Sequence, residues 1–483
     1  MGRTEKCRMT LVIVGMGLNT FTESYIMGHT APFVAGLFEE KEDLQLTDEV
    51  VSWIMSVMFL TMVVGTLLAT LITEKVGRRL TIVIFNVPVI IHWIMLYYAR
   101  DGYVLMVARL LAGVGFGGNI PITYMMTAEC SSAKMRGLNL AIITTVSPGI
   151  GAMTGSYVGI DVGWRQAAMI AIAPALLSLI IPLFCVESPH WLASKGRFEE
   201  CEVAFTSLHG IKPSAQKELQ SMLNVEKSKF DNSEKNVNAM KVTLKRLKVA
   251  ATKRYFWNIL LIASVLNIYK MICGRIIFGA FGILILQKIT GQSDVLLYIM
   301  VLNVISLVGS GFTIIMLKKI NFRTLLFPAG IFNNLLLIGL SISLYFNYDY
   351  YDNSLIVLSN VVMYFGHLVI IAVILFPILE AVPAELYPLE IRGVCNTIVA
   401  FIGTGFCFLL IKVSPALFAL LDYYGFLSIT ACLMFFMLLF FWIKLPETKG
   451  RTLTEIELDF KNKNLVNPDD NISKEETKEF LRV

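Results

Sequence analysis

The sequence alternates between long apolar runs and short polar segments. Most of the apolar runs have about 20 residues or more, which is the length of helix that crosses the ~30 Å hydrocarbon core of a membrane. The pattern predicts twelve membrane-spanning helices, at residues 9–36, 50–73, 80–98, 103–126, 137–160, 165–187, 256–287, 294–317, 324–346, 354–384, 395–419 and 423–444.

The charges between the predicted spans fix an orientation. Loops on one side carry basic residues, such as Lys75, Arg78 and Arg79 after the second span. Loops on the other side are acidic or mixed, as in EEKED at 39–43 and NYDYYD at 347–352. Because basic loops stay in the cytosol, both ends of the chain are predicted to be cytosolic.

Composition excludes the soluble classes. The chain of 483 residues is 56% hydrophobic and 16% charged, whereas a soluble domain carries about 25% charge. A transmembrane β-barrel would alternate polar and apolar residues in segments of about ten residues, and these runs do not. The first run follows Arg3, Lys6 and Arg8 and is too long for a signal peptide, so we interpret it as the first span.

One long hydrophilic insert, 188–255, divides the spans into six and six. It holds 13 Lys or Arg against 7 Asp or Glu and has helical spacing near 197–209 and 213–229. The predicted domains are an N-terminal bundle (1–187), a cytosolic linker with short helices (188–255), a C-terminal bundle (256–444) and a cytosolic tail (445–483). The linker is interpreted either as a solvated tether or as a regulatory segment. A substrate site is expected between the two bundles.

Nothing in the sequence points to catalysis. None of the eight cysteines lies in a predicted outside loop or has zinc-ligand spacing, so we expect neither an extracellular disulfide nor a metal site. No nucleophile–base pair or phosphate-binding loop is apparent. We expect a protein that is not an enzyme and that has no catalytic residue, no metal, no cofactor and no nucleic-acid partner.

The two halves repeat short motifs at their cytosolic ends. AECSSAKMRG (128–137) follows the fourth span and AELYPLEIRG (384–393) follows the tenth, and each has an acid seven residues before Arg-Gly. VESPHWLASKGR (186–197) and LPETKGRT (445–452) follow the sixth and twelfth spans. These repeated motifs indicate that the two halves of the chain are duplicates of one another.

With the GRR of 77–79 and the glycines after Arg109, these motifs resemble the sugar-porter branch of the major facilitator superfamily, over about residues 10–457. GHTAP at 28–32 and the very short first outside loop are most similar to insect facilitated trehalose transporters. The resemblance implies an all-α polytopic membrane protein, with twelve transmembrane helices in two six-helix bundles. It also implies a carrier that works by alternating access.

The resemblance implies a set of gating ion pairs at the cytosolic ends of the spans. The residues carried over are Glu74, Arg78, Arg79, Glu129, Arg136, Glu187, Glu385, Arg392 and Glu447. Thr70 and Glu74 stand where the family has Gly and Asp, and KKINFRT (318–324) lacks the acid and the Gly-Arg pair of the second-half copy. We therefore expect gating to depend more on the first half.

The expected sugar site departs from the family. KMICGRI (270–276) aligns with the family's Gln-Gln-x-Ser-Gly-x-Asn, so that Lys270 and Met271 replace the two glutamines. Glu380 stands where the family has Trp, and Thr144 replaces a glutamine. The candidate substrate-binding residues are Thr144, Lys270, Arg275, Glu380 and Asn396.

Two acids in the spans require an explanation, because an unpaired charge at the membrane centre costs about 3 kcal/mol. Glu380 is interpreted either as a structural salt bridge with Lys270 or Arg275, or as a cavity residue that touches substrate. Glu23 lies three residues before the aligned position of the family's proton-coupling Asp and on nearly the same face. A Glu23–Arg109 pair is therefore a candidate proton site, with a structural pair as the alternative.

The resemblance implies a transporter that moves a small solute, a hexose or trehalose, by facilitated diffusion. The charged residues keep two alternatives open: a carrier of a charged or zwitterionic metabolite, with or without proton coupling, and a receptor that binds a solute without transporting it. We expect a monomeric, multi-pass protein of the plasma membrane whose partners are its substrate and the lipid bilayer.

Overall fold

The computed structural model describes residues 3–40, 44, 46–132, 135–211, 213–233, 254–319, 321–346, 353–386 and 392–445. All regular secondary structure in these residues is helical. The first half forms α1 (Arg3–Glu39), α2 (Asp48–Val76), α3 (Arg78–Tyr98), α4 (Gly102–Cys130), α5 (Arg136–Ala141), the π-helical turn η1 (Ile142–Val146), α6 (Ser147–Asp161) and α7 (Trp164–Phe184).

Three helices of the linker follow, and then the second half of the chain. The linker helices are α8 (Pro189–Ser194), α9 (Phe198–His209) and α10 (Pro213–Ser233). The second half forms α12 (Arg254–Ile272), α13 (Arg275–Thr290), α14 (Leu296–Lys319), α15 (Phe322–Phe346), α16 (Ser354–Ile370), the π-helical turn η2 (Ile371–Leu375), α17 (Phe376–Leu386) and α18 (Arg392–Lys444).

Each predicted span coincides with helical structure, but three spans contain an irregularity that the hydrophobic pattern did not indicate. The spans at 137–160 and 354–384 contain the π-helical turns η1 and η2. The span at 256–287 is broken at Gly274, whose φ of 114° lies in the left-handed region that glycine enters at no steric cost. The last two spans run together as α18 and are separated by Asp422, the non-helical residue within it.

Helix α1 is less apolar than the other membrane-spanning helices. Its polar side chains are buried among the other helices rather than exposed to lipid: Asn19, Thr20, Thr22, Glu23, His29 and Thr30. A polar group buried in a membrane protein must find its hydrogen bonds inside the protein. The first helix is therefore the most polar part of the N-terminal bundle's interior.

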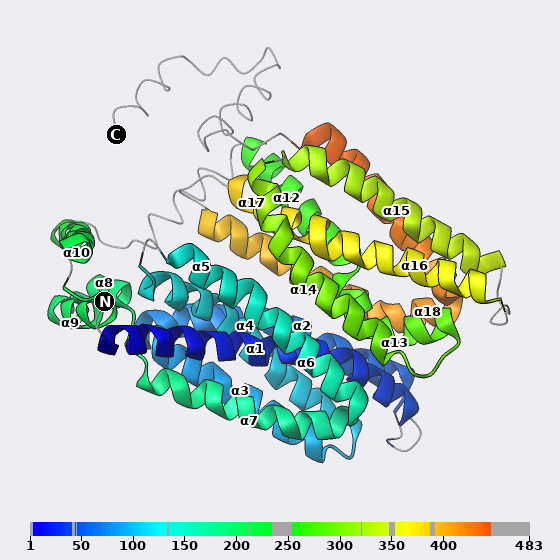
Figure 1. Ribbon diagram of the computed structural model, residues 1–483, viewed down its shortest axis with the longest axis horizontal. Helices are drawn as coiled ribbons and strands as arrows, with labels where there is room; N and C mark the ends of the chain where they lie inside the picture. The colour runs from blue at the N-terminus through cyan, green and yellow to red at the C-terminus, as the bar shows by residue number, and fades with distance from the viewer. Residues whose placement is uncertain are drawn as a thin grey trace, which may run out of the picture.

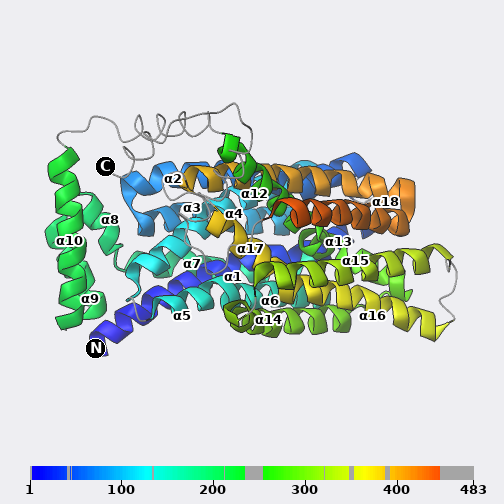
Figure 2. The same cartoon turned by 90° about the horizontal axis from the view of Figure 1, so that it is seen from above.

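The helices run roughly along the long axis of the molecule and form two bundles that lie side by side (Figures 1 and 2). Within the first, α2 packs on α4, α1 on α6, and α3 on α4 and α7. Within the second, α18 packs on α12 and α15, and α15 packs on α16. The bundles meet where α1 packs on α13, α2 on α18 and α6 on α14.

Glycines allow the closest of the helix contacts. A Cβ atom on Gly28 of α1 would lie 2.0 Å from the carbonyl oxygen of Ala152 in α6, and one on Gly117 of α4 would lie 2.0 Å from that of Met62 in α2. No side chain fits at these distances. Small residues at helix interfaces are typical of membrane bundles, because they let the backbones approach.

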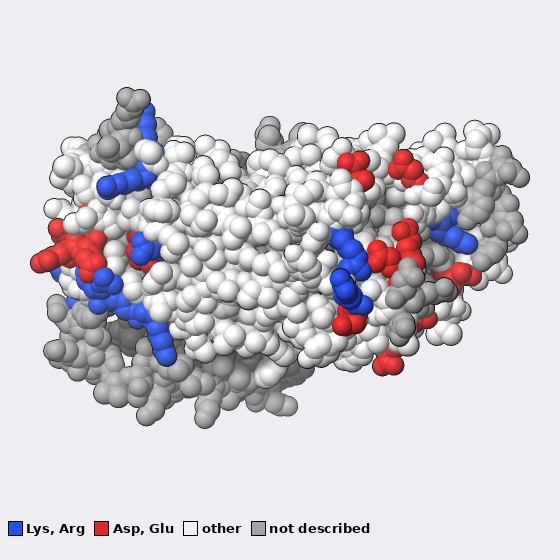
Figure 3. Space-filling view, turned by 90° about the horizontal axis from the view of Figure 1, so that it is seen from below, with Lys and Arg blue, Asp and Glu red and all other residues white. Residues whose placement is uncertain are grey.

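On the face that Figure 3 shows, charged side chains gather towards the two ends of the molecule and leave an uncharged band between them. We call the end that carries α8, α9 and α10 the linker end and the opposite end the distal end (Figure 1). The uncharged band is the surface expected for a protein that crosses a lipid bilayer.

Candidate functional site

A bidentate ion pair joins α3 to α4 at the linker end. The Arg78 Nε donates to Glu129 Oε2 at 3.0 Å and its Nη2 donates to Glu129 Oε1 at 3.1 Å. The two side chains are only 14% and 16% exposed. Two parallel charge-assisted bonds fix both distance and orientation, so this pair sets the spacing of the two helix ends.

Glu187, which follows α7, binds the start of α3 through its carboxylate. Glu187 Oε1 accepts hydrogen bonds from the backbone N–H groups of Arg78 at 3.0 Å and Arg79 at 3.2 Å. An anion is favoured at a helix N-terminus, where the N–H groups are free and the helix dipole is positive. The Ser188 hydroxyl donates to Glu129 and so connects this cap to the Arg78 pair.

The other predicted gating residues of the first half do not form an enclosed ion pair within the described part of the chain. Arg136 at the start of α5 lies 3.8 Å from Glu218 of linker helix α10, and both side chains are about 40% exposed. Arg79 Nη1 donates to the Cys185 carbonyl at 3.1 Å. Glu74 is exposed near the end of α2 and makes no ion pair with any described residue.

Five of the predicted residues lie partly or wholly outside the described part of the chain. Glu447 lies outside the described residues altogether. For the other four the structure describes the helical backbone but not the side chain: Arg275, Glu385, Arg392 and Asn396. Their roles stay predictions.

Lys270 and Glu380 form an ion pair between the two irregular spans of the second half. Lys270 lies in the last turn of α12, just before the break at Gly274, and Glu380 lies on α17 after η2. Lys270 Nζ donates to Glu380 Oε1 at 2.9 Å and also lies 5.8 Å from the centre of the Phe376 ring. Lys270 is 15% exposed and Glu380 is 54% exposed, so solvent reaches the carboxylate more easily than the ammonium.

Thr144, the other described candidate for substrate binding, lies exposed on η1. Its hydroxyl donates to the Leu140 carbonyl at 2.8 Å. This bond uses the hydroxyl proton within the helix and leaves the oxygen lone pairs free to accept.

Glu23 and Arg109 are both buried but are not paired with each other. Glu23 Oε1 accepts a hydrogen bond from Asn119 Nδ2 at 2.8 Å, while the Arg109 guanidinium lies 5.4 Å from the centre of the Phe33 ring. Asn119 also donates to Asn86 Oδ1 at 3.4 Å. Helices α1, α3 and α4 thus share a buried polar array, and Asn119 takes the place that we expected Arg109 to hold.

Two further polar contacts connect neighbouring membrane-spanning helices. His367 Nδ1 and Asn333 Oδ1 are 2.8 Å apart between α15 and α16. Lys412 of α18 donates to Ser52 Oγ of α2 at 2.7 Å. The sequence did contain a signal for the Lys412 contact, because a lysine within the apolar run 395–419 must find a partner.

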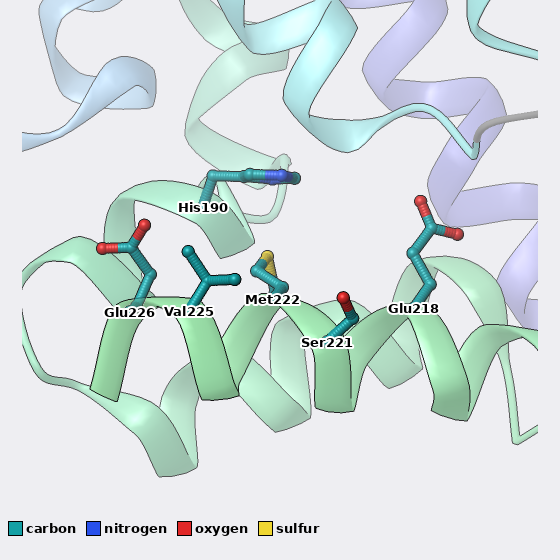
Figure 4. Close-up of a pocket in the computed structure, with 6 residues that line it drawn as sticks. All are labelled: His190, Glu218, Ser221, Met222, Val225 and Glu226. Atoms are coloured by element: carbon teal, nitrogen blue, oxygen red, sulfur yellow. The ribbon is translucent and has the colours of Figure 1, made fainter. Parts of the chain in front are cut away.

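A cavity of about 340 Å³ lies among the linker helices, between α8 and α10 (Figure 4). It is lined by His190, Glu218, Ser221, Met222, Val225 and Glu226. Nearby, burial lowers the pKa of His209; Glu218 opposes the shift, whereas Arg136 and His190 add to it. This cavity is formed by the linker helices and not by the spans, so it is not a site for a solute that crosses the membrane.

Known proteins resemble this chain along almost its whole length. The plant protein "Sugar transporter ERD6-like 6" of Arabidopsis thaliana is 25% identical over 473 residues, which cover 93% of this chain and 90% of the relative. "Facilitated trehalose transporter Tret1" of Bombyx mori is 23% identical over 464 residues, which cover 93% and 86% of the two chains.

The fold matches that of a solved transporter. The inward-open structure of the xylose transporter XylE from E. coli superimposes with a TM-score of 0.74 at 19% identity, over 93% of this chain and 99% of that one. The family described as "Sugar (and other) transporter" matches residues 12–460, which include both bundles and the linker. The chain therefore belongs to this family of multi-pass membrane transporters, within the major facilitator superfamily.

Proposed function

We propose that the protein carries a neutral sugar, a hexose or trehalose, across its membrane by facilitated diffusion. The observation that carries the proposal is the Lys270–Glu380 contact of 2.9 Å. Two charges stand where the family resemblance implies neutral residues, but they neutralise each other. A site with this pair has strong hydrogen-bonding groups without a net charge, and so it does not require a charged substrate.

The exposure of Glu380 supports a direct contact with the sugar. Its carboxylate is 54% exposed and Oε1 is the atom bound to Lys270, which leaves Oε2 available to accept from sugar hydroxyl groups. Hydrogen bonds to an ionised acceptor are stronger than those to an amide. Thr144 and the side chains of Arg275 and Asn396 complete the proposed binding set.

Alternating access would use the charged residues of the linker end as the cytosolic gate. The Arg78–Glu129 pair and the Glu187 cap hold the ends of the first bundle together. We propose that Glu74, Arg79, Arg136, Glu385, Arg392 and Glu447 complete the gate when the linker ends of the two bundles approach. The basic loops support a cytosolic linker end, and we propose a monomer in the plasma membrane with both termini in the cytosol.

The test is uptake by the purified protein in liposomes. Radiolabelled glucose and trehalose should enter until the inside and outside concentrations are equal, and unlabelled sugar inside should drive counterflow. Counterflow would exclude the receptor, which binds without transport. Absence of sugar uptake in liposomes that take up an amino acid or an organic ion would overturn the proposal.

A zwitterionic substrate is the second candidate, and the unequal exposure of the ion pair favours it. The ammonium group of such a substrate could compete with Lys270 for the exposed Glu380. Uptake and competition experiments distinguish the two cases. Under the first proposal a zwitterion in excess should leave sugar uptake unchanged, whereas under the second the labelled zwitterion should be taken up and sugar in excess should not compete with it.

A further inference from the structure

Lys412 joins the two bundles towards the distal end of the molecule. It lies on α18, and its ammonium group donates to Ser52 Oγ at 2.7 Å and to the Glu49 carbonyl at 3.4 Å, both on α2. The same group lies 4.2 Å from the centre of the Trp53 ring. All these partners belong to the other bundle.

The first turns of α2 are arranged to receive a cation. The Ser52 hydroxyl donates its own proton to the Glu49 carbonyl at 2.8 Å, so its lone pairs are available to Lys412. The Trp53 ring offers its negative face and packs 5.8 Å from the Phe408 ring of α18. Hydroxyl, carbonyl and aromatic face together surround the ammonium group. The Glu49 carboxylate attracts it electrostatically, without an ion pair among the described residues.

A lysine within an apolar span is costly unless it is solvated or paired. In this conformation the hydrogen bonds of Lys412 go across the interface between the bundles. When the bundles separate at the distal end, water must replace these partners. The contact therefore exists in one state of the transporter and not in the other, which is the condition for a residue to bias a conformational equilibrium.

We propose that Lys412 is a gating residue that holds the distal side of the transport pathway shut. Its bonds to Ser52 and Glu49 and its contact with Trp53 close α18 onto α2, and their release accompanies distal opening. The proposal does not depend on the substrate, because it concerns the empty protein. A failure of sugar transport would therefore leave it standing.

The test measures the opening of the distal end directly. Spin labels are placed at Tyr103→Cys of α4 and Leu420→Cys of α18, which are 76% and 79% exposed. The exposed cysteines Cys7 and Cys432 are changed to serine. Double electron–electron resonance spectroscopy of the labelled protein in lipid nanodiscs then gives the distribution of distances between the two labels.

We expect one dominant short distance in the parent protein and a second, longer distance in Lys412→Met. The ratio of open to closed molecules should rise about tenfold, equal to about 1.4 kcal/mol. Lys412→Arg should retain the parent distribution, because it keeps the cation. Lys444→Met, on the same helix at the linker end, serves as the matched control.

Ser52→Ala is a second variant, which keeps the test valid if Lys412→Met does not fold. It should shift the distribution of distances in the same direction by a smaller amount. An unchanged distribution in both Lys412→Met and Ser52→Ala would overturn the proposal. A shift in Lys412→Arg as large as that in Lys412→Met would overturn it too, since packing rather than charge would then hold the contact.

Discussion

Arg78 and Glu129 face each other across α3 and α4 with two nearly equal hydrogen bonds, of 3.0 and 3.1 Å. The pair is largely enclosed, and each partner has a second attachment: the Arg78 backbone to Glu187 and the Glu129 carboxylate to Ser188. Three helices and the linker therefore meet at one ion pair. This convergence makes the pair a structural element of the first bundle as well as a part of the proposed gate.

Glu129→Gln should lower the melting temperature of the purified protein. The substitution leaves the enclosed Arg78 guanidinium without its counter-charge, and a hydrogen bond to a charged group contributes about 1.5–3 kcal/mol. Glu200→Gln is the matched control, because it removes the exposed Arg197–Glu200 pair of the linker, and exposed pairs contribute little. Equal melting temperatures for Glu129→Gln and the parent would show that the pair does not stabilise the fold.

Gly77→Ala should destabilise the same region for a different reason. Gly77 has a φ of 96°, and a Cβ atom on it would lie 2.4 Å from Glu187 Oε2. The added methyl group would both strain the backbone and displace the carboxylate that caps α3, at a cost of about 1–3 kcal/mol. Gly137→Ala is the control, since a Cβ atom there has nothing within 4 Å. Equal melting temperatures for Gly77→Ala and Gly137→Ala would contradict this account.

The two partners of the Lys270–Glu380 pair should respond unequally to substitution. Glu380→Gln leaves the mostly enclosed Lys270 unpaired, whereas Lys270→Met leaves a carboxylate that solvent reaches. We expect Glu380→Gln to lose more stability, by about 1 kcal/mol after allowance for the exposed carboxylate. The double variant should recover part of the loss, because it contains no unpaired charge.

Transport by these variants tests the role of Glu380 in binding. If the carboxylate accepts from the sugar, Glu380→Gln should raise KM for sugar uptake in liposomes more than it lowers kcat. If the pair is only structural, the double variant should transport with the parent KM. Full sugar transport by Glu380→Gln with an unchanged KM would remove Glu380 from the proposed site.

Acid should destabilise the linker helices through His209. Burial lowers the pKa of His209 in the folded protein, so the unfolded chain binds a proton that the folded chain does not. Stability is therefore highest above the ordinary histidine pKa, about 6.5, and falls as the pH drops from there towards the lowered value. His209→Gln should reduce the loss of melting temperature between pH 7.5 and pH 5.5.

The exposed His190 is the control for this measurement. His190→Gln should reduce the loss of melting temperature by less than His209→Gln does, because His190 is exposed and only adds to the shift that burial causes at His209. If His209→Gln and the parent lose the same number of degrees on acidification, the acid sensitivity has another source.

The hydrophobic pattern was sufficient to predict the fold, because a membrane imposes the length and polarity of each span. It could not predict the break at Gly274, since its left-handed conformation depends on packing: a Cβ atom there would collide with the Phe278 ring and approach His367. The positions of the charged residues were visible in the sequence, but their partners were not. Lys412 and Ser52 are 360 residues apart, and no local pattern connects them.

The family resemblance indicated both Lys270 and Glu380 as candidate substrate-binding residues, and the structure places them in contact. The same reasoning proposed Arg109 as the partner of Glu23, whereas the structure places Asn119 there. The difference lies in geometry that an alignment does not contain. Shifting the acid by three residues keeps its face of α1 but moves it along the helix axis by about 4.5 Å, which changes the residues of α4 that it can reach.

Glu23→Gln tests whether this buried acid couples transport to protons. Glutamine keeps an oxygen that can accept from Asn119 Nδ2 but cannot gain or lose a proton. Under facilitated diffusion, sugar uptake by Glu23→Gln should stay within about twofold of the parent at pH 5.5 and 7.5. Glu23→Ala is the contrasting variant, because it removes the shorter of the two hydrogen bonds that the buried Asn119 amide donates, at a cost of about 1–3 kcal/mol. Acid-driven accumulation of sugar in the parent that disappears in Glu23→Gln, with counterflow retained, would instead make Glu23 the proton carrier and the protein a symporter.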